Sequence, residues 1–234
     1  MKNYFKNRKI LEDGNVYSKN MEHDACGVGL IASTEGKKSR KVVEYGINAL
    51  KAVFHRGAVD ADGKTGDGAG IHLEIPSDFF AEKIEITGHQ HDGSDICVGM
   101  IFLPRNNYEA QENVRTLVES ELTKSNFNIY GWRQVPVNTK VLGEKANFTR
   151  PEITQVLFKN NNKSLKGKDL ERKLYESRRK IEKEAIKNAI EGFYICSLSS
   201  KSIIYKGMFL AESIADFYTD LKDERFISRY AIFH

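Results

Sequence analysis

A short apolar run near the middle of the chain sets the strongest constraint on its fold. Residues 96–104 read Ile-Cys-Val-Gly-Met-Ile-Phe-Leu-Pro and are nearly continuous in apolar side chains. The run is too short for a buried helix and is typical of a central strand that is covered on both faces. A chain with such a strand has to place other elements on both sides of it.

The residues before this run predict a strand, a helix and a second strand. Residues 27–33 alternate small and apolar side chains, and Ser39 is suited to cap the helix that follows them. Gly57 stands where that helix is expected to end, and residues 71–76 alternate strictly, as a half-buried strand does. The apolar face of the helix is expected to hold Val43, Ile47, Leu50 and Phe54.

The residues after the run predict further helices and strands. Residues 150–170 are rich in Asn and Lys and are interpreted as a polar connection. Segments 193–198 and 202–207 are expected to pair as a hairpin. The other predicted elements are an amphipathic helix over 114–122, a strand over 130–137, a charged helix over about 168–190 and the start of a strand over 230–234.

Cys26 opens the sequence Cys-Gly-Val-Gly-Leu-Ile at the head of the first predicted strand, directly after the polar residues 21–25. If the chain is cleaved before this cysteine, its thiol lies beside a free α-amine with a pKa of about 7.7–8.0, which can accept the thiol proton near neutral pH. The pattern predicts that residues 1–25 are a propeptide and that Cys26 is a nucleophile only after their removal. A small buried core cysteine is the alternative on spacing alone.

Composition and charge exclude several classes of protein. The net charge of +4 is spread along the chain, so neither nucleic acid nor a membrane is an expected partner. The 3 cysteines have no CxxC spacing, which argues against a disulfide framework and a zinc site and favours the reducing cytoplasm. Residues 1–25 hold no apolar run long enough for a signal peptide or a membrane span.

Several motifs stand in an order that is far more specific than any one of them. They are Asp-Ala-Cys-Gly-Val-Gly (24–29), His-Arg-Gly-Ala (55–58), Thr-Gly-Asp-Gly-Ala-Gly-Ile (65–71) and Ile-Pro-Ser-Asp-Phe-Phe (75–80), with looser matches at 130–133, 193–199, 205–208 and 229–234. In these motifs the chain resembles the start of the glutamate synthase large subunits, in which this region is a class II glutamine amidotransferase domain. The resemblance covers essentially the whole chain.

The resemblance implies a fold and a reaction. Residues 26–234 are expected to form an α+β domain of the N-terminal nucleophile hydrolase type, an αββα sandwich with antiparallel sheets that is truncated at its C-terminal side. The Cys26 thiolate is expected to attack the side-chain amide of glutamine, to release ammonia and to leave a γ-glutamyl thioester that water hydrolyses to glutamate. In the full subunit the ammonia is expected to aminate 2-oxoglutarate.

Cofactors and partners are implied in the same way. FMN and an iron–sulfur cluster are expected in the full-length subunit and none within this chain, which has no cluster-binding set of cysteines. The expected partners are glutamine, the remaining domains of the large subunit and a small electron-donating subunit.

Three further residues are candidates for the site. Arg56 resembles the arginine found near the glutamine site in this class; it either holds a carboxylate or fixes the loop, and the supporting role is slightly favoured. Gly57 belongs to the same motif. Asp67 lies in a glycine-rich loop that lacks GxGxxG spacing and precedes a strand, which favours a tight connection over a phosphate loop and leaves Asp67 as a site contact.

Other histidines and other functions are less favoured. His55 is expected to be structural, and His89 and His91 are expected to be solvated, so no metal site is predicted. The alternatives are the glutaminase domain of another class II amidotransferase, such as the one that opens purine biosynthesis, and a catalytically silent fragment. A thiol redox protein is disfavoured because no resolving cysteine lies nearby in the sequence.

The 234-residue chain by itself is expected to show negligible glutaminase activity. In the resembling family the oxyanion donors are a later Asn-Gly pair, and losing one such donor costs roughly 3–4 kcal/mol of transition-state stabilisation. The measurement is steady-state ammonia release at saturating glutamine. Turnover that Cys26→Ala abolishes would contradict this expectation.

Overall fold

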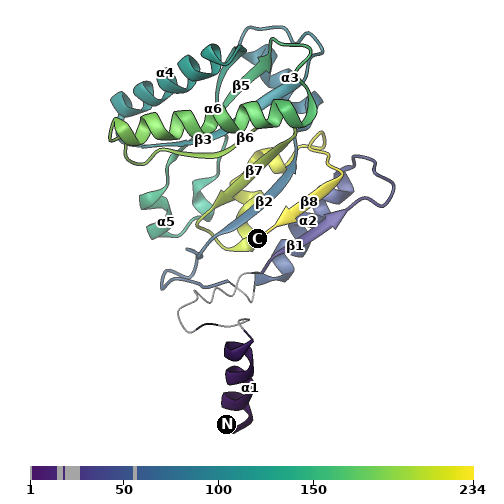
Figure 1. Cartoon of the computed structure of the whole chain (residues 1–234), viewed down its shortest axis with the longest axis vertical. Helices are drawn as coiled ribbons and strands as arrows, with labels where there is room; N and C mark the ends of the chain where they lie inside the picture. Colours follow the sequence, from purple (N-terminus) through teal and green to yellow (C-terminus); the bar gives the residue numbers. More distant parts are fainter. Residues whose placement is uncertain (1, 15–17, 19–26, 55–56) are drawn as a thin grey trace.

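The computed structural model of the chain describes residues 2–14, 18, 27–54 and 57–234. These residues form a mixture of helices and strands (Figure 1). The helices are α1 (Lys2–Asp13), α2 (Arg40–Ala52), α3 (Ser77–Ile86), α4 (Tyr108–Lys124), α5 (Glu144–Thr149), α6 (Gly167–Lys187) and α7 (Ile214–Phe217), with short 3-10 turns η2 (Thr139–Val141), η3 (Ala211–Ser213) and η4 (Thr219–Lys222). The strands are β1 (Gly29–Ala32), β2 (Ala69–Glu74), β3 (Ile96–Leu103), β4 (Phe127–Gln134), β5 (Glu152–Asn160), β6 (Tyr194–Ser199), β7 (Ser202–Gly207) and β8 (Tyr230–Phe233).

The strands form two antiparallel four-stranded sheets, in the orders β1-β8-β2-β7 and β4-β5-β3-β6. The predicted α+β class with antiparallel sheets is therefore confirmed. None of the helices in the described residues is long and apolar enough to cross a bilayer.

The second sheet has a recognisable connectivity. Its elements follow one another as β3-α4-β4-β5-α6-β6, and each strand is antiparallel to its neighbours, which is the split βαβ arrangement. Helices α4 and α6 cover one face, where apolar residues such as Val118, Phe158 and Ile181 form a fully buried cluster. The predicted central strand is β3, and it is buried as expected.

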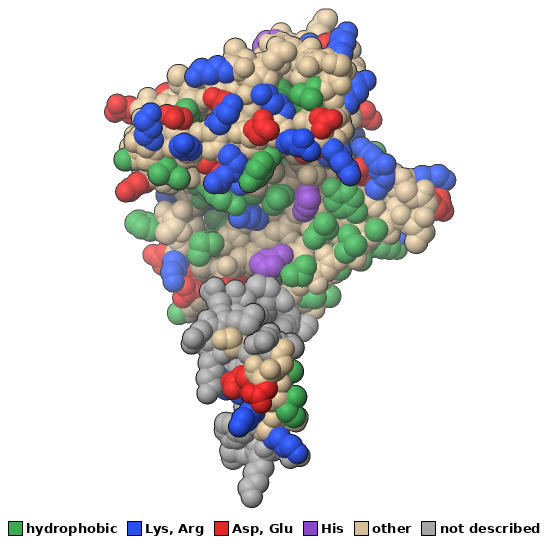
Figure 2. Space-filling model, in the orientation of Figure 1, with side chains coloured by type: hydrophobic (Ala, Val, Ile, Leu, Met, Phe, Trp, Pro, Cys, Tyr) green, Lys and Arg blue, Asp and Glu red, His purple; other side chains and the backbone are tan. Residues whose placement is uncertain are grey.

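The first sheet is covered on one face by α2, which Ser39 caps as predicted: its hydroxyl accepts a hydrogen bond from the Val42 amide at 3.4 Å. The helix packs so closely on β8 that a Cβ on Gly46 would lie 2.4 Å from the Cβ of Ala231. On the opposite face Leu30 and Ile232, which are cross-strand partners, are 61% and 39% exposed. Figure 2 shows hydrophobic side chains gathered around a hollow at this part of the molecule.

Three predictions about local structure were wrong. Helix α2 ends at Ala52, so Phe54 lies beyond it and is 66% exposed instead of packed. The expected hairpin does not form, because β6 pairs with β3 while β7 pairs with β2. The polar connection contains β5, an inner strand whose buried Thr154 and Gln155 find hydrogen-bond partners at Ile101 O and Tyr205 Oη.

A buried ion pair joins the two sheets. Asp220 accepts two hydrogen bonds from the guanidinium of Arg133 on β4, at 2.8 and 2.6 Å. The phenol of Tyr205 on β7 donates to the same carboxylate at 3.0 Å, and Gln155 on β5 contacts both Arg133 and Tyr205. Burial raises the pKa of Tyr205 well above its ordinary value, with the Asp220 charge acting in the same direction, so the phenol remains a donor.

Asp220→Ala is expected to lower the free energy of unfolding by about 3–5 kcal/mol, because it leaves the guanidinium of Arg133 buried without its partner. Urea unfolding of the purified chain, followed by the fluorescence of its single tryptophan, measures this loss. The matched control is Asp216→Ala, which removes an ion pair with Lys222 that is more than half exposed on both sides and is worth about 0–1 kcal/mol. Equal losses of unfolding free energy in the two variants would contradict the stabilising role given to the buried pair of Asp220 and Arg133.

Candidate functional site

Two of the four predicted site residues, Cys26 and Arg56, lie outside the described residues. Their neighbours in the chain, Gly27 and Gly57, are described, and both line one pocket of about 280 Å³ together with Asp67. The rest of its wall comes from the end of α2, the loop 57–68, the segment 209–212 and His234. The structure therefore brings both described candidates, and the chain beside the other two, to a single pocket.

Gly57 and Asp67 are in direct proximity. The amide of Asp67 donates to the carbonyl of Ala58 at 3.2 Å, and a Cβ on Gly57 would lie 3.2 Å from Asp67 Oδ1. A bridge between Val59 and Gly66 closes the loop between them into a narrow two-stranded turn. A side chain at position 57 would make the Asp67 carboxylate shift by a few tenths of an ångström, so glycine keeps this contact free of crowding.

The glycines of the loop that carries Asp67 serve two purposes. Gly63 and Gly68 have φ angles of +69° and +138°, in the region that favours glycine, as the interpretation as a tight connection requires. Gly66 instead permits close approach, since a Cβ there would lie 2.6 Å from the carbonyl oxygen of Phe209. The loop is therefore pressed against the backbone that follows β7.

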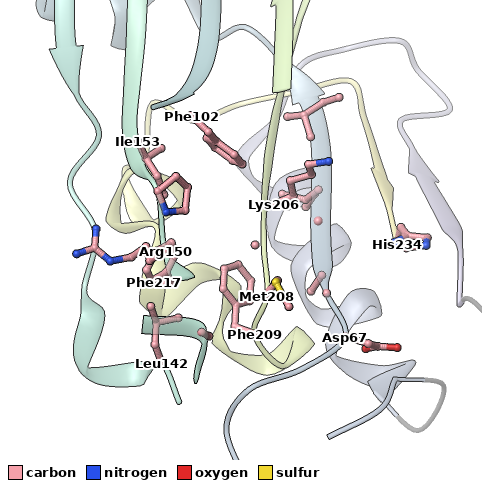
Figure 3. A pocket seen from close by; sticks show the side chains of 18 of the residues that line it. Asp67, Phe102, Leu142, Arg150, Ile153, Lys206, Met208, Phe209, Phe217 and His234 are labelled. Carbon is pink, nitrogen blue, oxygen red and sulfur yellow. The ribbon is translucent and has the colours of Figure 1, made fainter. Parts of the chain in front are cut away.

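A second, larger cavity of about 560 Å³ adjoins the first. Asp67, Gly68, Phe209 and His234 line both. Figure 3 shows Phe102, Leu142, Ile153 and Phe217 on its apolar wall and Asp67 and His234 at one side. The Lys206 ammonium on its wall donates to the hydroxyl of Tyr194 at 3.0 Å.

His234 lies at the junction of the two cavities. Its backbone exchanges two hydrogen bonds with Gly70 of β2, of 3.1 and 2.9 Å, which extends the pairing of β8 beyond Phe233. Sequence reasoning did not assign His234, Phe209 or the segment 210–212 to the site. The motifs at 205–208 and 229–234 were the available signals, because Phe209 directly follows the first and His234 ends the second.

The remaining histidine candidates lie elsewhere. His55 is outside the described residues, and His89 and His91 make local contacts with the Thr87 hydroxyl and the Ser94 carbonyl. Within residues 2–14, 18, 27–54 and 57–234, no group of three His, Cys, Asp or Glu side chains is arranged to hold a metal ion.

The two described cysteines are poor nucleophiles. Cys97 and Cys196 are both buried, and burial raises the pKa of the Cys97 thiol far above its ordinary value and that of Cys196 to about 12. A thiol in such surroundings stays protonated and unreactive. Neither of these two cysteines is therefore suited to nucleophilic chemistry.

Comparisons with known proteins show what the chain is similar to. The profile of the class-II glutamine amidotransferases matches residues 26–234. The chain is 55% identical over 228 residues to the glutamate synthase [NADPH] large chain of Azospirillum brasilense, which covers 97% of this chain and 15% of that protein. It is 39% identical over 214 residues to ferredoxin-dependent glutamate synthase 2 of Synechocystis, covering 91% of this chain and 13% of that protein. The chloroplastic ferredoxin-dependent enzyme of Spinacia oleracea is likewise 39% identical, over 215 residues, with coverage of 91% and 13%.

Alkylation of the native chain at pH 8 is expected to leave Cys97 and Cys196 unmodified. With a pKa of about 12, Cys196 is a thiolate in only ~1 of 10⁴ molecules at that pH, and its burial excludes the reagent as well. Peptide mass mapping after a short iodoacetamide treatment measures this, with the urea-unfolded chain as the control in which both thiols react. Similar modification of Cys196 in native and unfolded protein would contradict the conclusion that its thiol is buried and unreactive.

Proposed function

Because the chain belongs to the class-II glutamine amidotransferases, we propose that it hydrolyses glutamine with Cys26 as the nucleophile and supplies the ammonia to a glutamate synthase. The observation that carries the proposal is the 280 Å³ pocket, which is lined by the residues next to Cys26 and Arg56 and by Asp67. The family match that begins at residue 26 supports removal of residues 1–25 as a propeptide.

The proposed reaction has two steps. The α-amine of the mature Cys26 accepts the thiol proton, and the sulfur attacks the side-chain carbonyl carbon of glutamine. The carbon–nitrogen bond breaks, the amide nitrogen takes the proton and leaves as ammonia, and a γ-glutamyl thioester remains. Water then adds to the thioester, glutamate leaves, and the thiol returns to its first state.

The charges of the site suit free glutamine. The Asp67 carboxylate at the pocket wall is placed to receive the α-ammonium group of the substrate, which would form a charge-assisted contact. Arg56 either binds the α-carboxylate or fixes the loop, and Gly57 leaves the space that Asp67 needs.

The later steps are proposed for other parts of a longer protein. The chain spans 13% to 15% of the length of the relatives named above. We place the amination of 2-oxoglutarate, the FMN, the iron–sulfur cluster and the contact with an electron-donating subunit in those parts. Cys97 and Cys196 do not suit a cluster, because they lie in separate apolar clusters. A cytoplasmic location fits these two free thiols.

The test uses the full-length polypeptide that carries these residues. Wild-type protein is expected to release ammonia from glutamine, and Cys26→Ala to lower kcat by roughly 10⁴-fold or more. The matched control, Cys196→Ala, removes a buried thiol and is expected to keep most of the activity. Acid quenching during turnover is expected to trap one glutamyl group on a peptide that begins at Cys26.

Two results would overturn the proposal. Ammonia release that survives Cys26→Ala would exclude this nucleophile. A purified protein that keeps residues 1–25 and releases no ammonia would favour the catalytically silent alternative.

A further inference from the structure

The loop that forms one wall of the small pocket is fastened to α5, a helix in the connection between β4 and β5. The loop spans residues 57–68, and α5 begins at Glu144. In sequence they are far apart, and α5 belongs to the split βαβ unit instead of the sheet that carries the pocket. The contacts between them are polar and specific.

The centre of the attachment is the carboxylate of Asp62. Its Oδ1 accepts from the amides of Lys64 and Thr65 at 2.9 and 2.7 Å. Its Oδ2 accepts from the Thr65 hydroxyl at 2.6 Å and from the Lys145 amide at 3.4 Å. The carboxylate therefore bridges the loop and the first turn of α5.

Thr65 completes the bridge from the loop side. Its side chain is buried, and its oxygen accepts a hydrogen bond from the Ala146 amide at 3.2 Å while donating to Asp62. Asp62 Oδ2 and the Thr65 hydroxyl oxygen thus accept hydrogen bonds from backbone amides in the first turn of α5. Such amides have no hydrogen-bond partner within the helix. The hydrogen bonds from Thr65 hold the pKa of the Asp62 carboxyl well below its usual range, so it is ionised at neutral pH.

The approach of the two segments requires a glycine. A Cβ on Gly143 would lie 2.2 Å from Asp62 Oδ2 and 2.4 Å from the Thr65 hydroxyl oxygen. No other residue fits there without separating the loop from α5. A second link, between Lys145 and Asp60 at 2.6 Å, is largely exposed and contributes less.

The narrow turn couples the position of Thr65 to the residues in the pocket wall. The Asp60 amide donates to Thr65 O at 2.9 Å, and the Asp67 amide donates to Ala58 O at 3.2 Å, so Thr65 cannot shift without moving both strands of the turn. Gly57 and Asp67 stand at its open end, in the pocket wall.

We propose that Asp62 and Thr65 are positioning residues that hold the 57–68 loop in its glutamine-binding arrangement by fastening it to α5. The proposal rests on the proposed glutaminase function. Neither residue touches the substrate. They act by keeping the loop in the arrangement that binds glutamine. If only a fraction of the molecules has this arrangement, the apparent affinity for glutamine falls in proportion to that fraction.

Steady-state kinetics of the full-length protein test this role. Asp62→Ala and Thr65→Val are each expected to raise KM for glutamine about tenfold while kcat changes less than about threefold. Thr65→Ser, which keeps the hydroxyl, is expected to restore KM. Lys145→Ala, which breaks the exposed ion pair but keeps the Lys145 amide, is the matched control and is expected to stay within about twofold.

A double-mutant cycle separates positioning from general damage. Because both side chains act through one attachment, the combined variant is expected to raise KM no further than either single variant. Additive effects, a fall in kcat with unchanged KM, or wild-type KM in both single variants would each overturn the proposal.

A readout that does not need catalysis distinguishes this proposal from the proposed function. Hydrogen exchange of the Thr65 and Ala146 amides is expected to quicken at least about tenfold in Asp62→Ala and not in Lys145→Ala. If wild-type protein shows no Cys26-dependent ammonia release but this exchange pattern holds, the glutaminase function fails while the attachment stands. Unchanged exchange in Asp62→Ala overturns the attachment itself.

Discussion

The ion pair of the buried Asp220 carboxylate fixes how the two sheets are aligned across the apolar core that they share. The carboxylate accepts hydrogen bonds from Arg133 on β4 and from Tyr205 on β7, which belong to different sheets. A charge in such surroundings has to be fully paired, so the positions of these strands are determined together. Strand β7 is thereby held where its last residue, Gly207, and the following Phe209 meet the glycine-rich loop.

The small pocket is an assembly of segments that are distant in sequence. Gly27 precedes β1, the 57–68 loop follows α2, Phe209 follows β7 and His234 follows β8. Close approach at Gly66 and the two hydrogen bonds between Gly70 and His234 hold these segments together. The first sheet thus places the chain next to Cys26 beside a loop that carries a carboxylate, which is the geometry on which the proposed glutaminase chemistry rests.

Among the described residues, the split βαβ unit meets the loop of the small pocket through its β4–β5 connection. That connection holds α5, which meets Asp62 and Thr65. The same connection lines the larger cavity through Leu142, which precedes α5, and Ala146. The sheet of this unit is packed against α4 and α6 through a buried apolar cluster. A binding loop that is fastened to such an element keeps its shape at little entropic cost when a ligand binds.

The sequence by itself determined the α+β class, the cap at Ser39, the buried strand β3 and the family, because apolar periodicity, capping residues and ordered motifs are local properties. Only the tertiary structure decided that β6 and β7 enter different sheets, that Thr154 and Gln155 lie in an inner strand, and that Phe209, His234 and α5 border the site. The physical reason is the same in each case. Buried polar groups and strand edges are satisfied by partners far away in the chain, and one-dimensional patterns do not specify those partners.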